Sequence, residues 1–418
     1  MHFMKTSAGS ICAGLLACYV MGIPGVVLAQ ESVTDTLKRQ IGDMQDQLKK
    51  ALDRIDQLEK EKSTSTVRVG EVEKSVQSLK AAPGALNPGI GMVLDSTIEH
   101  RSQGGGNFNW RAAEFGFAAS IDPFARAYSF VTGSKDGVEV EEAAAITSSL
   151  PWNLTAKGGR FFADFGRFSK IHDHELPFVN RPLSMDRVIG GESQADGVEL
   201  AYLFPTPFFL RATLGGYNKI GADNERVDNS KSRSWSRFTY LGRLSTYFDI
   251  TDNHSLEVGA STAYTPSLRL AGDPIGGDRT LNGVDVTYRY QPLSSVVYQG
   301  VTWGSELFAN SERIPFEDLG VAKRRRSIGG YSYAEMKLNK NWSTGFLFDY
   351  APSIEKPGLK TIGYSPYVTW NLSEFNRLRF QFTHADDSVR TDKSERGNQF
   401  FLQWTTVIGA HTHGFLSR

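Results

Sequence analysis

From Ile90 onward, polar and apolar residues alternate in one segment after another. In 361–372, Val368 and Trp370 share one face, whereas Thr369 lies on the other. The same parity recurs in three further segments: 341–350, 377–383 and 399–410. A period of two is that of a β-strand with one polar and one apolar face. The sequence therefore predicts an all-β main body.

Alternation alone does not separate a soluble sandwich from a membrane barrel, so two other features decide. Aromatic residues fall toward strand ends on the apolar face, as in membrane-interface girdles: Trp342, Tyr350, Tyr364, Trp370, Phe400 and Trp404. Seven short turns also alternate with eight longer loops, which include 99–109, 163–195 and 305–327. These features predict an antiparallel transmembrane β-barrel of about sixteen strands over residues 86–413, with fourteen strands as the alternative.

The length and charge of the chain agree with an outer-membrane barrel. Sixteen strands need about 160 residues, and a barrel of that size encloses an aqueous lumen. The chain carries 46 basic and 46 acidic residues, which argues against a nucleic-acid partner. An even number of strands returns both ends of the barrel to the periplasmic side, and the expected partner of the outer face is membrane lipid.

The first 29 residues have the pattern of a secretory signal peptide. A basic start at Lys5 precedes an apolar run, and Ala29 is the expected cleavage site. A lipoprotein site at Cys18 is the alternative, although the residues that follow it stay apolar. Both cysteines, Cys12 and Cys18, lie in this segment, so the mature chain is expected to have no thiol chemistry.

Residues 31–82 show a heptad pattern. Apolar residues step by four and three at Leu37, Ile41, Met44, Leu48, Ala51, Ile55 and Leu58. This spacing predicts a periplasmic coiled coil that joins the barrels into a homotrimer and reaches toward the cell wall, with a dimer as the alternative because the core positions mix branch types. A single amphipathic helix folded onto the barrel is the alternative interpretation.

Charged residues on the polar faces are candidates for the pore lining. They are Arg289, Arg377, Arg379, Glu199, Asp349 and Glu335. The mixture of signs does not predict a charge selectivity. The alternative is that these residues only brace and solvate the wall.

The long loop from Phe165 to Ala195 carries its own apolar residues, so we expect it to fold inward and narrow the pore. It contains the sequence His172-Asp173-His174-Glu175, and the chain ends near His411 and His413. In an extended segment each His-x-His pair offers two imidazoles to one ion, with carboxylates adjacent. These residues are candidate ligands for Zn²⁺, as ligand or cargo rather than resident cofactor, and a solvated loop without metal is the alternative.

The sequence lacks the motifs of the common enzyme classes. The sequence has no nucleophile elbow, zincin helix, phosphate loop or dinucleotide loop. We therefore expect no enzymatic activity.

Several segments of the main body resemble a family of proteobacterial outer-membrane barrels described as zinc-regulated or TonB-dependent-receptor-like. The resemblance is carried by Leu86-Asn87-Pro88, Met92 to Asp95, Val138 to Ala143, Gly159-Arg160-Phe161-Phe162, the His172/His174 loop, Asp196 to Leu200, and Asn398 to Gln403 with Gly409-Ala410-His411. It implies a link to metal supply, with His172, His174 and His411 as candidates.

The receptor part of that resemblance conflicts with the strand count. A plugged receptor barrel has twenty-two strands, and no plug-like region precedes Ile90. The sequence thus favours a porin-like outer-membrane channel for small solutes, among them zinc or its complexes. A tether to the cell wall and a closed, ligand-gated receptor are the alternatives.

Overall fold

The computed structural model describes residues 49–50, 52, 88–102, 104–148, 150–224, 234–268, 277–292, 298–316, 321–354, 356–388 and 396–409. The chain divides into two compact units, Met1–Ala85 and Leu86–Arg418. The predicted signal peptide lies outside the described residues. So does nearly all of the predicted coiled coil, of which Lys49, Lys50 and Leu52 are described as helical.

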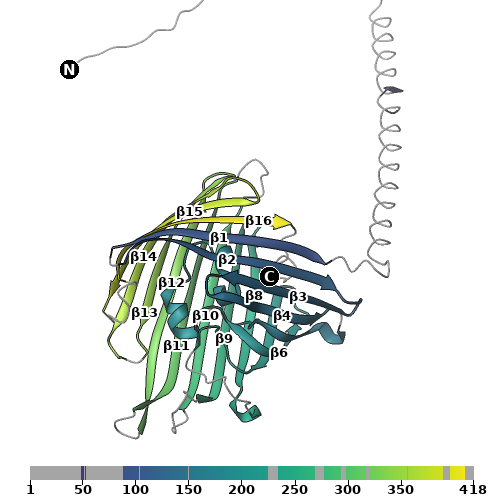
Figure 1. Ribbon diagram of the computed structural model, residues 1–418. Helices are drawn as coiled ribbons and strands as arrows, with labels where there is room; N and C mark the ends of the chain where they lie inside the picture. Colours follow the sequence, from purple (N-terminus) through teal and green to yellow (C-terminus); the bar gives the residue numbers. More distant parts are fainter. Residues whose placement is uncertain are drawn as a thin grey trace, which may run out of the picture. The chain divides into compact units, whose positions relative to one another are not determined.

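The second unit is a closed antiparallel barrel of sixteen strands (Figure 1). The strands are β1 (Gly89–Arg101), β2 (Gly105–Ser120), β3 (Ala125–Ser134), β4 (Gly137–Thr147), β5 (Leu154–Phe162), β6 (Gln194–Leu203), β7 (Phe209–Tyr217), β8 (Thr239–Thr251), β9 (His254–Leu268), β10 (Gly277–Tyr290), β11 (Gly300–Phe316), β12 (Val321–Lys337), β13 (Trp342–Pro352), β14 (Lys360–Asn371), β15 (Asn376–Asp387) and β16 (Gly397–Gly409). Each strand pairs with its neighbours in sequence, and β1 closes the barrel against β16. The prediction of sixteen strands is confirmed.

The two faces of the strands are inverted relative to a soluble protein. Along β14, Ser365 and Thr369 are buried in the barrel, whereas Tyr364, Val368 and Trp370 are exposed on the outside. Apolar residues that face outward and polar residues that face inward suit a wall between lipid and an aqueous lumen. Among the described residues, no helix is both long enough and apolar enough to cross a membrane.

Two predicted loops are wrong. Residues 305–327 were expected to form a long connection, but β11 and β12 are 17 residues each and continue through most of it. The basic run from Lys323 to Arg326 therefore lies in β12, where the Arg324 guanidinium donates to the Asp278 carboxylate at 2.7 Å. The expected loop 99–109 is also mostly strand, because β1 and β2 pair as far as Arg101 and Gly105. In both places the ladder hydrogen bonds continue beyond the apolar band.

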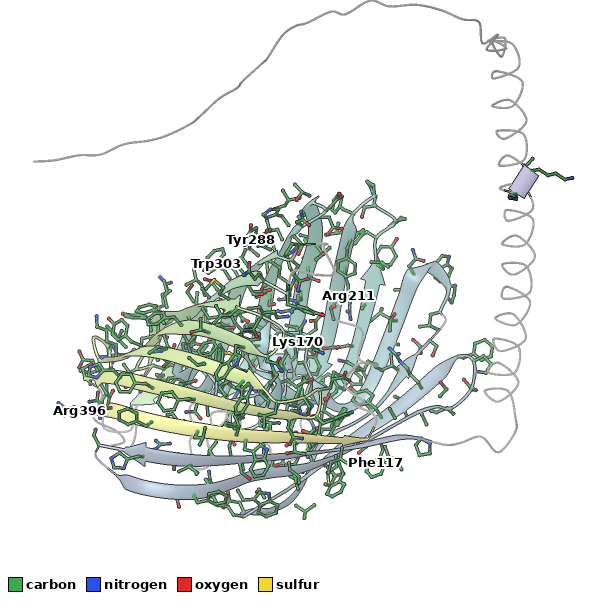
Figure 2. All side chains as sticks on the ribbon, turned by 90° about the horizontal axis from the view of Figure 1, so that it is seen from above. Phe117, Lys170, Arg211, Tyr288, Trp303 and Arg396 are labelled. Carbon is green, nitrogen blue, oxygen red and sulfur yellow. The ribbon has the colours of Figure 1, made fainter. Side chains whose placement is uncertain are left out.

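The segment between β5 and β6 folds into the lumen. We call residues 163–193 the docked loop. It contains the short 3₁₀-helices η2 (Phe168–Lys170) and η3 (Asp173–Glu175) and the helix α2 (Leu183–Ile189); two further 3₁₀-helices, η1 (Pro151–Asn153) and η4 (Trp235–Arg237), lie elsewhere. Lys170 of this loop is seen within the ring of strands, whereas Phe117 and Trp303 lie on its outside (Figure 2).

The hydrophobic core of the barrel unit lies where the docked loop meets the inner wall. Phe165, Phe178 and Met185 of the loop have no solvent exposure. They pack in one cluster with inward-facing aromatic residues of the wall, which include Tyr217, Phe308, Tyr331, Tyr333 and Tyr367. The lumen therefore holds a packed core on which the loop is fixed.

Candidate functional site

The docked loop is attached to strands on several sides of the lumen. The Arg379 guanidinium donates to the carbonyl oxygen of Phe178 at 3.0 Å, and the backbone N–H of Val179 donates to Gln381 Oε1 at 2.8 Å. On another side, the backbone N–H groups of Arg167 and Phe168 both donate to Glu306 at 2.8 Å. Contacts to β11 and to β15 place the loop across the lumen and make it the main constriction.

Cavities lie on both sides of this constriction. On the short-turn side are cavities of about 650 Å³ and 180 Å³, the larger reaching Asn339 and Asn371 beside the turns. A third, of about 410 Å³, lies on the long-loop side beside Arg101 and Asp223. The loop thus divides the lumen into two vestibules.

The six predicted pore-lining residues all border these cavities. Glu199 borders the 180 Å³ cavity and Asp349 the 410 Å³ cavity. The other four line the 650 Å³ cavity: Arg289, Arg377, Arg379 and Glu335. Several of them also hold the loop or the wall, since Asp349 accepts from the backbone N–H of Ser184 at 3.3 Å and Glu199 from that of Asp164 at 2.7 Å.

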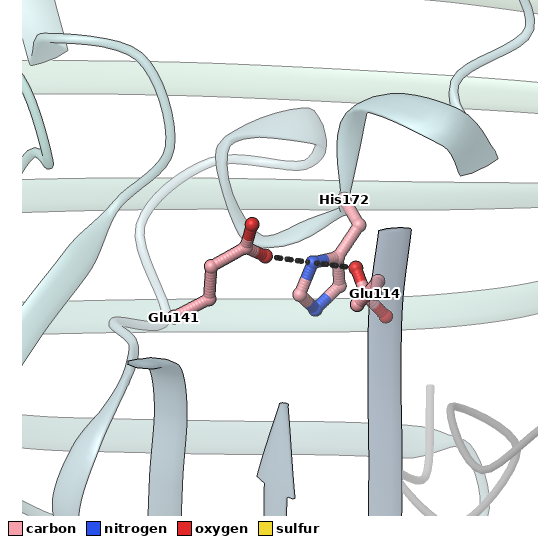
Figure 3. A group of neighbouring side chains, drawn as sticks. All are labelled: Glu114, Glu141 and His172. Carbon is pink, nitrogen blue, oxygen red and sulfur yellow. Dashed lines mark hydrogen bonds and ion pairs between the residues drawn. The ribbon is translucent and has the colours of Figure 1, made fainter. Parts of the chain in front are cut away.

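His172 of the loop lies beside Glu114 of β2 and Glu141 of β4 (Figure 3), and Glu142 of β4 joins this group. His172 Nδ1 lies 2.8 Å from Glu141 Oε2 and 3.2 Å from Glu114 Oε2, and its Nε2 lies 3.1 Å from Glu142 Oε1. His174 is stacked beside it at 5.7 Å between ring centroids, with its Nδ1 3.6 Å from Glu114 Oε2. We call His172, His174, Glu114, Glu141 and Glu142 the histidine cluster.

Two β-bulges aim side chains of the wall at the loop. In β4 the pairing with β3 jumps from Glu142 to Val140, so Glu141 is the extra residue and both adjacent glutamates reach His172. In β2 the pairing with β1 jumps from Ala112 to Trp110, which makes Arg111 the extra residue. Bulges commonly re-aim a side chain at a functional site, as both do here.

The ring of His172 is held in one orientation. It is 2% exposed and lies between Phe130 and Phe162, at 5.1 and 4.6 Å between ring centroids. Its partner Glu142 also accepts from the Tyr128 hydroxyl and from the Phe162 backbone N–H, both at 3.1 Å. The Glu142 carboxylate is therefore fixed independently of the histidine.

His172 and Asp164 of the docked loop have strongly shifted pKa values. Burial disfavours the charged ring of His172, but Glu114, Glu141 and Glu142 outweigh it and raise the pKa of His172 well above its ordinary value. Burial likewise disfavours ionised Asp164, but Lys170 and Arg243 hold the pKa of its carboxyl well below its usual range. Without metal, a protonated His172 and an ionised Asp164 fit these surroundings.

The predicted metal ligands are only partly brought together. The expected extended geometry at 171–175 is wrong, because Asp173–Glu175 forms η3. Asp173 turns from the imidazoles and binds the guanidinium groups of Arg111 and Arg181, at 3.0 and 2.7 Å. Glu175 borders the short-turn cavities. His411 and His413 lie outside the described residues.

The sequence reading missed Glu114, Glu141 and Glu142 as partners of the histidines. The stretch Glu139-Val140-Glu141-Glu142 carries a signal, because two consecutive carboxylates break the period of two that the rest of the strand keeps. Such a break indicates a bulge, and a bulge permits two neighbours to face one site. Glu114 gives no comparable signal.

Comparisons with known proteins agree with this barrel. It resembles the anion-selective porin of Comamonas acidovorans (TM-score 0.53, 11% identity, 78% of this chain and 99% of that one). It also resembles the channel DcaP of Acinetobacter baumannii (0.52, 10%, 77% and 97%) and a trimer form of OmpT of Vibrio cholerae (0.51, 9%, 77% and 99%). At these identities the likeness shows the fold alone, and sixteen strands differ from the twenty-two of a plugged receptor.

Sequence comparison adds a relative. No family model matches the chain. A protein of Aquifex aeolicus strain VF5, described as uncharacterized, is 30% identical over 334 residues, which cover 73% of this chain and 69% of the Aquifex protein. The link to metal supply implied by the zinc-regulated family stays a prediction. The chain belongs to the same protein family as this Aquifex aeolicus protein.

Proposed function

We propose that this chain is a porin-like channel of the outer membrane that passes small solutes along a lumen narrowed by its docked loop. The observation that carries the proposal is a closed sixteen-strand barrel with an apolar outside, a polar inside and cavities on both sides of the loop. The likeness to structures described as porins and outer-membrane channels supports it. No catalytic role is part of the proposal.

The charges around the larger short-turn cavity favour anions over cations. Six basic residues line it: Arg167, Arg289, Lys337, Lys340, Arg377 and Arg379. Two acidic residues, Glu175 and Glu335, accompany them. Arg379 is 3% exposed and donates to neutral oxygens of Thr369, Gln403 and Phe178, so it adds to the positive potential of the cavity wall without contacting a solute directly. An excess of positive charge along a pore raises the local concentration of anions.

Conductance in planar bilayers tests the channel directly. The wild type is compared with a variant in which residues 166–191 are replaced by a short Gly/Ser linker, and with a control in which 353–359 is shortened instead. We expect small unitary steps in wild type and control and several-fold larger steps without the docked loop. If the wild type and the variant without the docked loop both fold but neither conducts, the channel proposal is wrong and a tether or a closed receptor is favoured.

Selectivity is measured in the same bilayers from the reversal potential across a KCl gradient. Lys337 and Lys340 are exposed, so Lys337→Gln/Lys340→Gln should leave folding intact and lower the ratio of chloride to potassium permeability. Gln substitution of Lys356, which lies in an exposed loop, is the control. An unchanged ratio would refute the anion preference. Zinc added to the same bilayers tests whether the metal passes through the channel or blocks it.

We also propose that the channel is a homotrimer joined by the heptads of 31–82. The structure of Vibrio cholerae OmpT described as a trimer form supports a trimeric assembly for this type of barrel. Mass measurement of the detergent-solubilised protein should give three chains, and deletion of 31–82 should weaken the assembly. A monomeric full-length chain would exclude this assembly.

A further inference from the structure

We propose that His172, Glu114 and Glu141 form a binding site for a divalent metal, best suited to Zn²⁺, that ties the docked loop to β2 and β4. The three residues come from three separate elements, since His172 precedes η3, Glu114 lies in β2 and Glu141 is the bulge residue of β4. A metal bound by all three would bridge the loop to two strands of the wall. The site extends beyond the predicted His172/His174 pair, because its oxygen donors belong to the barrel.

The spacing of the donor atoms suits a small metal ion. His172 Nδ1 lies 2.8 Å from Glu141 Oε2 and 3.2 Å from Glu114 Oε2. All three donor atoms lie within 4.8 Å of one another. Tetrahedral zinc with bonds of about 2.0–2.1 Å holds its ligands roughly 3.3 Å apart. Small side-chain movements would therefore close these donors around an ion.

The surroundings of His172 match those of a metal-bound histidine. Its Nε2 faces Glu142 Oε1 at 3.1 Å while Nδ1 faces the two other carboxylates. Histidines that bind metals usually donate their second ring N–H to a carboxylate, which fixes the tautomer and raises the basicity of the ligand nitrogen. Glu142, itself held by Tyr128 and Phe162, provides that carboxylate.

The charge balance also favours a cation. Glu114, Glu142 and His172 are each at most 3% exposed, so unbalanced negative charge there is costly. With the carboxylates of Glu114, Glu141 and Glu142, a neutral His172 and Zn²⁺ sum to a charge of −1, against −2 for a protonated His172 without metal. The Nδ1 atom of His174, 3.6 Å from Glu114 Oε2, stands close enough to serve as a fourth ligand after a small shift. Imidazole and carboxylate ligands together are typical of zinc.

The cavity of about 180 Å³ on the short-turn side gives an entry path, since both His172 and Glu142 border it. Binding itself does not depend on the proposed channel function. The inference that bound zinc stiffens the constriction of the pore does rest on the proposed channel function. Binding is therefore measured without conductance, which keeps the two failures distinguishable.

The experiment measures zinc binding to the folded, chelator-treated full chain in detergent. A His411→Ala/His413→Ala background removes the C-terminal histidines from the measurement. Bound zinc is counted after equilibrium dialysis, and X-ray absorption reports nitrogen and oxygen ligands at zinc distances. We expect one zinc per chain, at least about a 100-fold loss of affinity in His172→Ala and Glu141→Gln, and a loss of about 10–100-fold in Glu142→Gln.

Two control variants separate this site from alternatives. His384→Ala removes a histidine that hydrogen-bonds Asn398, and Asp136→Asn removes a carboxylate from an exposed turn. Both should bind zinc as the background does. Folding is checked by the gel shift between unheated and boiled samples, and Glu141→Gln covers the case that His172→Ala fails to fold. No binding by the folded background, or binding unchanged in Glu141→Gln, would overturn the site and leave a protein-only ion cluster.

Discussion

Between Asp164 and Glu175 the docked loop is held largely by charged groups, whereas from Leu176 to Ile189 apolar packing and hydrogen bonds to its backbone dominate. The first part has the Lys170–Asp164 pair, the Arg167–Glu257 pair at 2.7 Å and the histidine cluster. The first part also buries Phe165, but the second part has more fully buried apolar residues, namely Leu176, Phe178, Val179 and Met185. Charged contacts respond to pH and to cations, whereas apolar contacts do not. We therefore call residues 164–175 the charged part of the loop and residues 176–189 its anchor.

The largest expected effect comes from removing the central ring of the anchor. Phe178 meets Phe168, Tyr331, Tyr333 and Tyr367 with ring centroids 5.6–6.4 Å apart, all edge-on. Phe178→Ala should cost about 3–5 kcal/mol of docking free energy. Hydrogen exchange should rise strongly in peptides from 176–189 and less in those from 164–175, within an intact barrel.

The matched control is Phe375→Ala, since Phe375 is 53% exposed at a short turn and should not affect the loop. An equal rise of exchange in both parts of the loop would break the comparison. It would mean that the loop undocks as one cooperative unit.

The next effect tests the charged part at Asp164. This carboxylate is 5% exposed and also accepts from the Thr213 hydroxyl at 2.8 Å. Asp164→Asn takes the paired carboxylate from Lys170 and removes one of the two carboxylates beside Arg243, which keeps Asp285, so we expect a loss of about 3 kcal/mol. Limited proteolysis should then cut the loop near Lys170, and Asp136→Asn in an exposed turn is the control.

The same residue predicts a response to acid. A carboxyl with a depressed folded-state pKa stabilises the loop above its unfolded pKa, about 3.9, and that stability is lost as the pH falls through the folded value. Since that value is well below the usual range, part of the stabilisation persists at pH 3. Pepsin at pH 3 should therefore cut Asp164→Asn faster than wild type. Equal rates would show that Asp164 is not what protects the loop in acid.

Zinc should act on the charged part alone. At a zinc concentration 100 times the Kd, binding stabilises the docked state by about 2.7 kcal/mol. Hydrogen exchange that requires the site to open should therefore slow about 100-fold. The slowing is expected in peptides around His172 and in β4 around Glu141, with little change around Met185. Chelator should reverse it, and Glu141→Gln should abolish it. Uniform slowing along the loop would contradict the division into two parts.

The sequence supports the barrel far better than the site. A strand period of two is a local property, and the turns of Pro, Asn and Asp mark where strands such as β14 end, so the strand number could be counted. The connection 305–327 could not be predicted, because the outward residues Ser311 and Arg313 of β11 are polar, so the apolar alternation ends before the strand pairing does. The partners of His172 were missed for a similar reason. Glu114 and Glu141 lie 58 and 31 residues before His172 in the sequence. Glu141 faces His172 because of a bulge that depends on the pairing of β4 with β3.

The smallest effect concerns the outer end of the anchor, where α2 meets β13 and β14. The Arg187 guanidinium donates to the Ala351 carbonyl oxygen and to the Thr361 hydroxyl, both at 2.6 Å. Arg187→Gln removes these bonds but leaves the packing of Met185, so we expect a loss of about 1–2 kcal/mol and locally faster exchange at 183–189. Arg237→Gln, in η4, is the control. Conductance should stay unchanged, because Phe178 and Val179 still hold the constriction. A clear rise in conductance would mean that α2, and not the aromatic cluster, anchors the loop.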